Sequence, residues 1–359
     1  MKDLIRSVIV IAAVCAVLFY VNSELNKGSG KAGSNDTITV YNWGEYIDPE
    51  LVDRFEEETG IKVIYETFDS NEAMMTKIEQ GGTSYDVAMP SEYAIEKMKE
   101  NDLLIPLDLS KIPNLEHIDP YFLDLPFDPG NEYSIPYFWG TVGIAYNPTL
   151  LEEGQTFESW EDLWDPALKG QVIIVDSARE VIGMGLNSLG YSLNSTDPDE
   201  LNEAFDKLST LTPNVKAIIG DEIVEMMRNE EASIALTWSG QAADMMWINE
   251  DITFSVPKEG SNLWFDNMII PSTAANVEGA HKFINFMLDP EVAAQNADYV
   301  GYSTPNKSAI ELMDPEVTGD ERFYPPVELR DRLEVYKNLG PEMLGVYNEL
   351  FLNFKMEMN

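Results

Sequence analysis

The chain contains few of the residues on which covalent and metal chemistry usually depend. Among its 359 residues are one cysteine, Cys15, and two histidines, His117 and His281. A single cysteine excludes an intrachain disulfide and a cysteine-based zinc site, and neither histidine lies in a ligand-spaced motif. A Ser-His-Asp hydrolase therefore has little to be built from. The G-x-S-x-G, P-loop and G-x-G-x-x-G motifs are also absent. The stretch GMGLNSLG at 183–190 has the wrong spacing and indicates close helix packing.

Positive charge is scarce as well. There are 23 Lys and Arg residues against 63 Asp and Glu, which gives a formal net charge of −40. Nucleic acid and anionic lipid are repelled by such a surface, so neither is expected as a main partner. The charge favours a cationic ligand, although an acidic surface also serves solubility alone. The length and a hydrophobic content of 44% indicate about two lobes with a sizeable core.

The first 23 residues have the pattern of a signal or membrane anchor. A basic start precedes an apolar run at 8–21, and a Gly/Ser-rich linker follows at 24–36. We favour an uncleaved anchor over cleavage after Ser23 or lipidation at Cys15. Each alternative places the remaining chain outside the cytoplasm, either tethered to the outer face of the cytoplasmic membrane or periplasmic or secreted.

The rest of the chain alternates strands and helices, which predicts an α/β fold with a mostly parallel sheet. Strands are predicted at 38–42, 61–67, 85–89, 141–146, 172–175, 233–238 and 264–270. Helices are predicted at 49–60, 70–80, 92–99, 178–189, 199–208 and 241–247, and mainly helices from 277 onward. Ser159 and Asp162 form a capping box before a short helix. The stretch 104–136 is rich in Pro and Asp and is expected to be irregular. Crossovers near 141–146 and 264–270 would divide the chain into two lobes with a cleft between them.

Aromatic rings and carboxylates gather at the predicted strand ends and in one later loop, where open α/β sheets bind ligands. The rings are Trp43, Tyr46, Tyr93, Trp238, Trp264 and Tyr302, and the carboxylates are Glu45, Glu180 and Asp266. An ammonium group binds carboxylates through charge-assisted hydrogen bonds and also gains energy over an aromatic face. Each residue alone is more simply explained by packing, and Glu180 by the helix dipole. Their repeated placement at independent strand ends predicts a site for a linear polycation.

Seven motifs resemble one family along most of the chain, from Thr37 to about Met356. They are YNWGEYIDPEL, ETGIKVIYETFDSNEAM, FDPGNEYSIPYFWGTVGIAYN, AREV, LWFDNMIIP, INFMLDPEVA and GYSTPN. The chain resembles the spermidine/putrescine-binding proteins of bacterial polyamine ABC transporters. The resemblance implies a two-lobed periplasmic-binding-protein fold of type II, with one lobe at 37–143 and 267–311 and the other at 144–266 and 312–359. It also implies a protein that closes on a polyamine and delivers it to a membrane permease. We expect closure about hinges near residues 143, 266 and 311, without catalysis and without a cofactor or metal. We also expect a monomer, because no oligomer signal is present and lobe closure needs free faces.

The resemblance also assigns roles to the residues at the strand ends. The six rings would enclose the methylene groups, and Ser91 would be a polar neighbour. Asp266 would bind the middle or secondary amine, and Glu45 and Glu180 the two ends. Ser177 stands where relatives carry an acid, a loss for which Asp176 could compensate, and Tyr336 stands where an amide contacts the ligand. These departures leave the preference among putrescine, spermidine and spermine open.

Three alternatives compete with the polyamine hypothesis. The same fold could hold an anion, iron or a sugar, but only Arg179 is a basic residue at a predicted strand end. A secreted glycoside hydrolase would use paired carboxylates and aromatic platforms. A structural surface protein would have no ligand at all.

Overall fold

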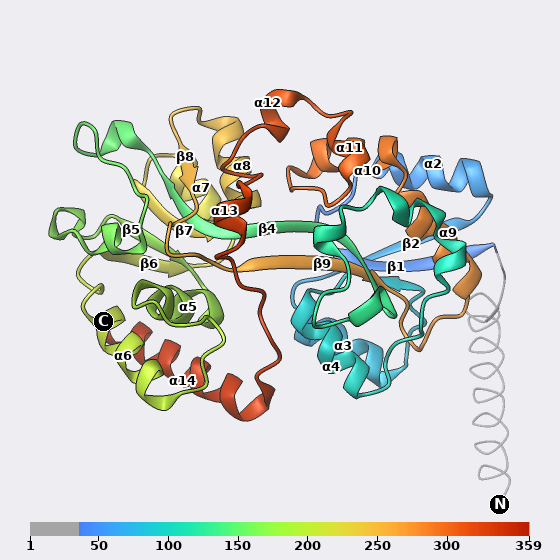
Figure 1. Ribbon diagram of the computed structural model, residues 1–359, viewed down its shortest axis with the longest axis horizontal. Helices are drawn as coiled ribbons and strands as arrows, with labels where there is room; N and C mark the ends of the chain where they lie inside the picture. The colour runs from blue at the N-terminus through green and yellow to red at the C-terminus, as the bar shows by residue number, and fades with distance from the viewer. Residues whose placement is uncertain (1–35, 359) are drawn as a thin grey trace, which may run out of the picture.

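Alternating strands and helices form two α/β lobes that lie side by side in the computed structural model, which describes residues 36–358 (Figure 1). The strands are β1 Thr37–Trp43, β2 Lys62–Phe68, β3 Val87–Ala88, β4 Ser134–Tyr146, β5 Val172–Val175, β6 Val215–Ile219, β7 Ile234–Trp238, β8 Thr253–Ser255 and β9 Leu263–Ile269. The helices are α2 Pro49–Thr59, α3 Asn71–Gln80, α4 Glu92–Glu100, α5 Ala178–Ser188, α6 Pro198–Ser209, α7 Glu222–Arg228, α8 Ser239–Ile248, α9 Val277–Met287, α10 Pro290–Val300, α11 Lys307–Ile310, α12 Pro315–Thr318, α13 Val327–Arg330 and α14 Gly340–Glu357. Short 3-10 helices lie between residues 109 and 168.

The export segment predicted at 1–23, with Cys15, and its linker up to residue 35 lie outside the described residues. Among the helices of residues 36–358, none combines the length and the apolar composition needed to cross a membrane.

Local sequence signals explain why the first helices begin and end where they do. The Asp48 side chain accepts a hydrogen bond from the Glu50 backbone at 2.9 Å and caps α2, which continues from Pro49. The helix ends at Gly60, whose φ of 71° suits glycine best. The predicted capping box of Ser159 and Asp162 is confirmed.

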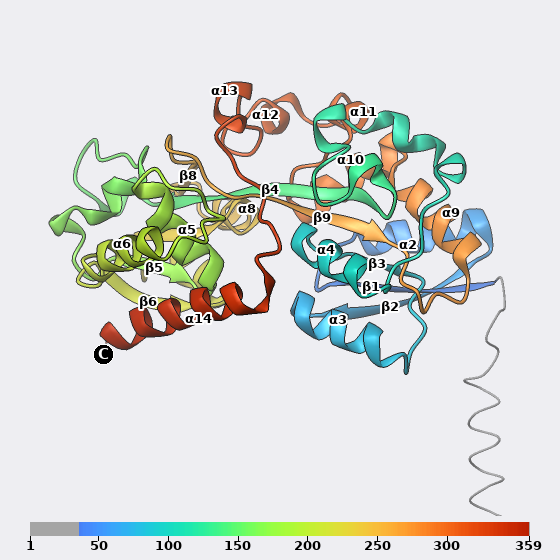
Figure 2. The ribbon, with the colours of Figure 1, turned by 60° about the horizontal axis from the view of Figure 1, so that its bottom comes forward.

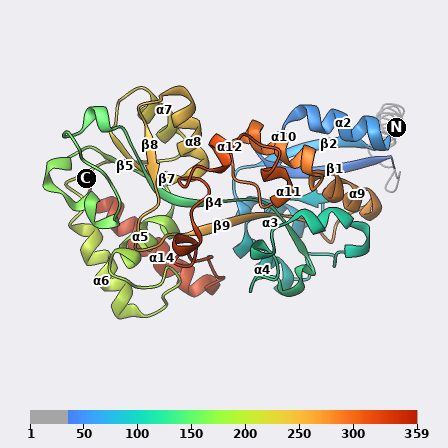
Figure 3. The ribbon, with the colours of Figure 1, turned by 45° about the horizontal axis from the view of Figure 1, so that its top comes forward.

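Two long antiparallel strands, β4 and β9, run from one lobe into the other (Figures 1 and 2). The full strand order is β2-β1-β3-β9-β4-β7-β5-β6, with β8 paired to β4. A third connection passes between α13 and α14, and the backbone of Leu263 donates to the carbonyl of Glu334 along it at 2.9 Å. α12 and α13 lie over the junction of the lobes on the side opposite α14, and Figure 3 shows α12 between α8 and α10.

Separate hydrophobic cores stabilise the two lobes. The first core is formed by buried residues from 38–139 and 263–313. The second is formed by buried residues from 142–236 and 347–354, and a smaller cluster packs on the other face of the same lobe's strands. β4 and β9 therefore carry the chain between two independently packed units.

The sequence prediction of β4 was wrong at its start. The strand begins at Ser134, inside the stretch expected to be irregular, rather than at residue 141. Pro136 argues against a strand because it lacks a backbone donor. The pairing accommodates it with a register shift between Pro136 and Phe138. The elements β6, α7 and β8 were also not predicted.

Candidate functional site

One face of the two connecting strands forms the floor of the candidate site. Side chains alternate along a strand, so Trp264 and Asp266 share one face of β9, and Asn262, directly before the strand, continues the same row. Their neighbours on β4 share that face, because Gly140 pairs with Trp264 and Phe138 with Asp266. Gly140 is needed there, since a Cβ would lie 2.3 Å from the Trp264 ring. The floor therefore combines an amide, an indole and a carboxylate in one row.

Asp266 is a buried carboxylate held by two hydroxyl groups. Tyr46 donates to Oδ2 at 2.7 Å, and Ser91 donates to Oδ1 at 2.7 Å. Ser91 is the N-cap residue of α4, but its side chain makes no cap hydrogen bond and is used for Asp266 instead. Burial raises the pKa of Asp266 to about 6, and the two hydroxyl donors oppose that rise.

Aromatic rings surround this carboxylate. The Tyr46 ring lies 5.2 Å from Phe138 and 5.3 Å from Tyr302, centroid to centroid. Tyr302 in turn meets Trp264 edge to face at 5.3 Å. These rings come from β4, β9, the turn after β1 and the loop after α10. Phe138 is part of this cage although the sequence analysis did not select it.

Glu180 is a second buried carboxylate, in the first turn of α5. Its Oε2 accepts a hydrogen bond from the Tyr336 hydroxyl at 2.7 Å. Its Oε1 accepts from the Trp238 indole at 3.3 Å and from the Asn262 amide at 3.4 Å. Burial raises its pKa, and these donors oppose the rise. Glu180 thus joins the row on β9 at the end opposite Asp266.

Basic side chains of the described residues make no direct pair with these acids, although the charge of nearby Arg179 lowers the pKa of Glu180. Within residues 36–358, no Lys or Arg forms an ion pair with Asp266 or Glu180. Arg179, the one basic residue at a predicted strand end, donates to the Lys337 carbonyl and to Asn194 Oδ1. Its guanidinium also lies 4.1 Å from the Tyr336 ring centroid. Arg179 is thus engaged in structural contacts, which does not favour an anion site.

A third buried acid, Glu92, was missed in the sequence. It is 1% exposed, and its Oε2 accepts a hydrogen bond from the Phe265 backbone at 3.0 Å. Burial raises its pKa to about 8, and the nearby charges of Asp266 and Glu180 act in the same direction. The available signal was its position between Ser91 and Tyr93, but an acid in a first helical turn is usually explained by the helix dipole.

The remaining predicted residues on the first lobe lie in different environments. The Trp43 indole donates to the Met89 carbonyl at 2.9 Å and its ring packs 4.5 Å from Phe68. The Tyr93 hydroxyl accepts from Asn71 at 3.0 Å, and the same amide donates to Ser91 at 3.1 Å. Glu45 is exposed in the turn after β1, with a φ of 51°, and makes no hydrogen bond within residues 36–358. The structure does not bring Glu45 into contact with Asp266 or Glu180.

The two predicted positions just before α5, Ser177 and Asp176, differ from each other. Ser177 is the N-cap residue of α5, without a side-chain cap hydrogen bond. Asp176 is exposed and pairs with Lys355 at 2.8 Å. The Asp176 carboxylate is therefore engaged by α14 and is not among the partners of Glu180.

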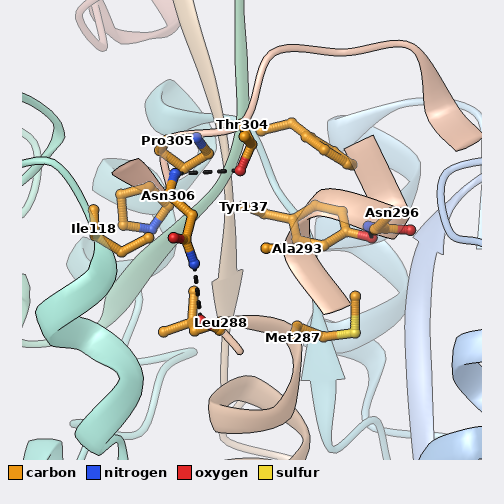
Figure 4. Close-up of a pocket in the computed structure, with 11 residues that line it drawn as sticks. Ile118, Tyr137, Met287, Leu288, Ala293, Asn296, Thr304, Pro305 and Asn306 are labelled. Carbon is orange, nitrogen blue, oxygen red and sulfur yellow. Dashed lines mark hydrogen bonds between the residues drawn. The ribbon is translucent and has the colours of Figure 1, made fainter. Parts of the chain in front are cut away.

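A small cavity in the first lobe is a packing feature rather than a ligand site. It is lined by Tyr137, Asn296 and Asn306, among others, and its volume of about 10 Å³ suits one water molecule (Figure 4). The Asn296 amide donates to the Tyr137 hydroxyl at 2.8 Å and the Asn306 amide to the Leu288 carbonyl at 2.8 Å. Elsewhere in residues 36–358, no group of His, Cys, Asp and Glu is placed to hold a metal ion.

Comparison with known proteins identifies similar chains over most of the length. A sequence model described as bacterial extracellular solute-binding protein matches residues 50–325. The spermidine/putrescine-binding periplasmic protein of Salmonella typhimurium is 39% identical, over 92% of this chain and 95% of the relative. The putrescine-binding periplasmic protein of Escherichia coli is 35% identical, over 87% of this chain and 89% of the relative.

Solved structures agree with these relatives. The substrate-binding protein of a spermidine/putrescine ABC transporter from Streptococcus pneumoniae is 56% identical, with a TM-score of 0.86. The alignment covers 90% of this chain and 100% of that one. A putative spermidine/putrescine ABC transporter protein from Listeria monocytogenes is 63% identical, with a TM-score of 0.83, over 89% of this chain and 99% of that one.

We expect Glu92→Gln to remove a pH-dependent loss of stability. The folded-state pKa of Glu92, about 8, lies above its unfolded value, so its contribution is fully present below the unfolded pKa and is lost as the pH rises through about 8. The variant should gain on the order of a few kcal/mol over the wild type at pH 8.5 and little at pH 4.5. Urea unfolding of both proteins at the two pH values measures this difference, and an equal gain at both would contradict it.

Proposed function

The chain belongs to the family of bacterial extracellular solute-binding proteins, and on that premise we propose that it binds a polyamine, putrescine or spermidine, between its lobes. It would then deliver the ligand to the membrane permease of an ABC transporter. The names of the similar proteins from Salmonella, Escherichia and Streptococcus support both the ligand class and the transport role. All of them are named as binding or transporter proteins, so we propose that the chain carries out no catalysis.

The observation that carries the proposal is a pair of buried acids that form no ion pair with any Lys or Arg of residues 36–358. Asp266 and Glu180 are each 7% exposed. Asp266 accepts hydrogen bonds from two hydroxyl groups, and Glu180 from a hydroxyl, an indole and an amide, and all of these donors favour the ionised form. A buried carboxylate without a counter-ion is costly, and a ligand with an ammonium at each end would supply two counter-ions. A polyamine would therefore supply the positive charges that pair with the carboxylates of Asp266 and Glu180.

The row on β9 also fits the shape of such a ligand. Glu180 contacts Asn262 at one end, Trp264 lies in the middle, and Asp266 stands at the other end. The strand rises about 3.3 Å per residue, so four residues span roughly 13 Å. A linear molecule lying along the row would place methylene groups against Trp264 and Tyr302, where burial contributes about 0.8 kcal/mol per CH₂.

We further propose that the lobes close on the ligand about hinges near residues 143, 266 and 311. The lobes would comprise 37–143 with 267–311, and 144–266 with 312–359. Tyr302 packs against the first core, whereas Gly240 lies in the first turn of α8, which packs on the other lobe. A Cβ on Gly240 would lie 1.6 Å from the Tyr302 ring, so the two lobes meet closely at this point. Closure of this kind is typical of periplasmic binding proteins.

The location follows from the family, which is described as extracellular. We propose that residues 1–23 tether the protein to the outer face of the cytoplasmic membrane and that it acts as a monomer. Its net charge of −40 would also attract a cationic ligand, an effect that salt weakens.

Calorimetry of the full-length chain with putrescine, spermidine and spermine tests the proposed function. We expect binding of at least one amine, and a loss of roughly a hundredfold or more in Asp266→Asn, because an ammonium would be buried without its carboxylate. Glu153→Gln is the matched control, since it removes one charge from an exposed residue. An equal loss in both variants would mean that general electrostatics, not Asp266, binds the ligand. Absence of binding to all three amines would refute the polyamine function.

Affinity should also depend on pH. Below about pH 6 the free protein carries a proton on Asp266, and that proton must leave before an ammonium can pair with the carboxylate. The affinity is therefore expected to fall as the pH is lowered from 7 to 5, by up to tenfold per pH unit for one proton. Calorimetry across this range measures the slope, and Glu92→Gln controls for the proton of Glu92, whose pKa is also raised. A flat profile between pH 5 and pH 7 would contradict the role of Asp266.

Gly240→Ala should oppose closure. Its methyl group would force the Tyr302 ring and the second lobe apart, so we expect the affinity to fall roughly tenfold or more while the lobes stay folded. Gly345→Ala is the matched control, because that helical glycine has open space around its Cβ position and no positive φ. Calorimetry with circular dichroism on both variants separates closure from folding. Unchanged affinity in Gly240→Ala would refute the closed contact.

A further inference from the structure

Asn262 carries a buried oxygen that nothing in the described chain satisfies. The residue is 3% exposed, and its Nδ2 donates to Glu180 Oε1 at 3.4 Å. Its Oδ1 makes no hydrogen bond within residues 36–358. The opposite amide orientation would place this oxygen against the Glu180 carboxylate, where it would be repelled, so the assignment has a physical basis. Such unpaired buried acceptors are rare and call for a partner.

The position of this oxygen is defined by the strand and by Glu180. Asn262 directly precedes β9, two residues before Trp264 and four before Asp266, and so continues the row that these two side chains form on one face of the strand. Its backbone carbonyl accepts from Val142 at 3.3 Å, where β4 and β9 connect the lobes. Because Oδ1 and Nδ2 are bonded to the same carbon, an amide that contacts Glu180 keeps its free oxygen beside that carboxylate.

The Glu180 end of the row needs another acceptor. An ammonium group has three donors, while Glu180 already accepts from Tyr336, Trp238 and Asn262. Ser177 supplies no carboxylate, and Asp176 is paired with Lys355. Among the side chains that contact Glu180, Asn262 has the one unpartnered acceptor.

We propose that Asn262 is a ligand-binding residue whose Oδ1 accepts a hydrogen bond from the ammonium group paired with Glu180. The inference rests on the proposed function and deepens it by adding a neutral acceptor at one end of the site. The two ends then differ in chemistry. At one end the carboxylate of Asp266 is supported by hydroxyl groups, and at the other Glu180 is supported by an amide oxygen that contacts the ligand directly.

Asn267 provides a matched control on the same strand. It is fully buried, and its Oδ1 is also without a partner in the described chain. Its Nδ2 donates to the Phe265 carbonyl at 3.3 Å. Being an odd number of residues away from Asn262, it projects from the opposite face of β9. Asn267→Leu therefore reproduces the removal of a buried amide from β9 without touching the ligand face.

Calorimetry of the full-length wild type, Asn262→Leu and Asn267→Leu with putrescine and spermidine tests the inference. We expect Asn262→Leu to bind the amine that the wild type binds roughly tenfold or more weakly, and Asn267→Leu to bind it as the wild type does. Equal affinity in the wild type and Asn262→Leu would overturn the inference and leave the proposed function intact. An equal loss in both variants would overturn it too, since the loss of affinity would then come from removing any buried amide of this segment and not from a contact between Asn262 and the ligand. A wild type that binds neither amine would overturn both.

A crystal structure of the wild type with the bound amine gives a second test that needs no substitution. It applies even if Asn262→Leu fails to fold. A ligand nitrogen within about 3.2 Å of Asn262 Oδ1 would support the contact and distinguish it from a role that only positions Glu180. A ligand nitrogen paired with Glu180 but out of hydrogen-bond reach of that oxygen would overturn the inference.

Discussion

Burying an ionised carboxylate away from water costs several kcal/mol unless hydrogen bonds and a counter-charge replace the lost hydration. Asp266 and Glu180 have the hydrogen bonds, but within residues 36–358 neither forms an ion pair with a basic side chain, and the nearby charge of Arg179 acts only on Glu180. The rest of the site depends on that imbalance. Tyr46, Ser91 and Tyr336 hold the acids in place, and the aromatic rings exclude water around them. The cationic ligand that we propose would supply the missing counter-charge.

The position of these acids links binding to the architecture. Asp266 lies on β9, one of the two strands that run between separately packed lobes, while Glu180 lies on α5 of the second lobe. A ligand that bridges Asp266 and Glu180 would contact both β9, which connects the lobes, and the second lobe itself. The close approach of Gly240 and Tyr302 shows how little room remains when the lobes meet. We infer that ligand charge and lobe closure stabilise one another.

Much of the fold could be predicted because its signals are local. Asp48, Pro49 and Gly60 define the limits of α2, and alternating strands and helices indicate the α/β class. The start of β4 could not be predicted, since Pro136 lowers strand propensity and only the tertiary pairing with β9 overrides it. Helix packing at 183–190 was predicted correctly, as a Cβ on Gly185 would lie 2.9 Å from Leu208.

The sequence by itself determined the residue types of the site, the excess of acids and the ends of β1 and β7, where Tyr46 and Trp238 occur. Asp266 was expected at a strand end as well, but it lies in the middle of β9. Only the tertiary structure decided which of them meet. It placed Glu180 beside Asn262 and Tyr336, left Glu45 exposed, paired Asp176 with Lys355 and buried Glu92 against β9. The reason is physical. Propensity and alternation act over a few residues, whereas burial and charge pairing depend on segments far apart in the chain.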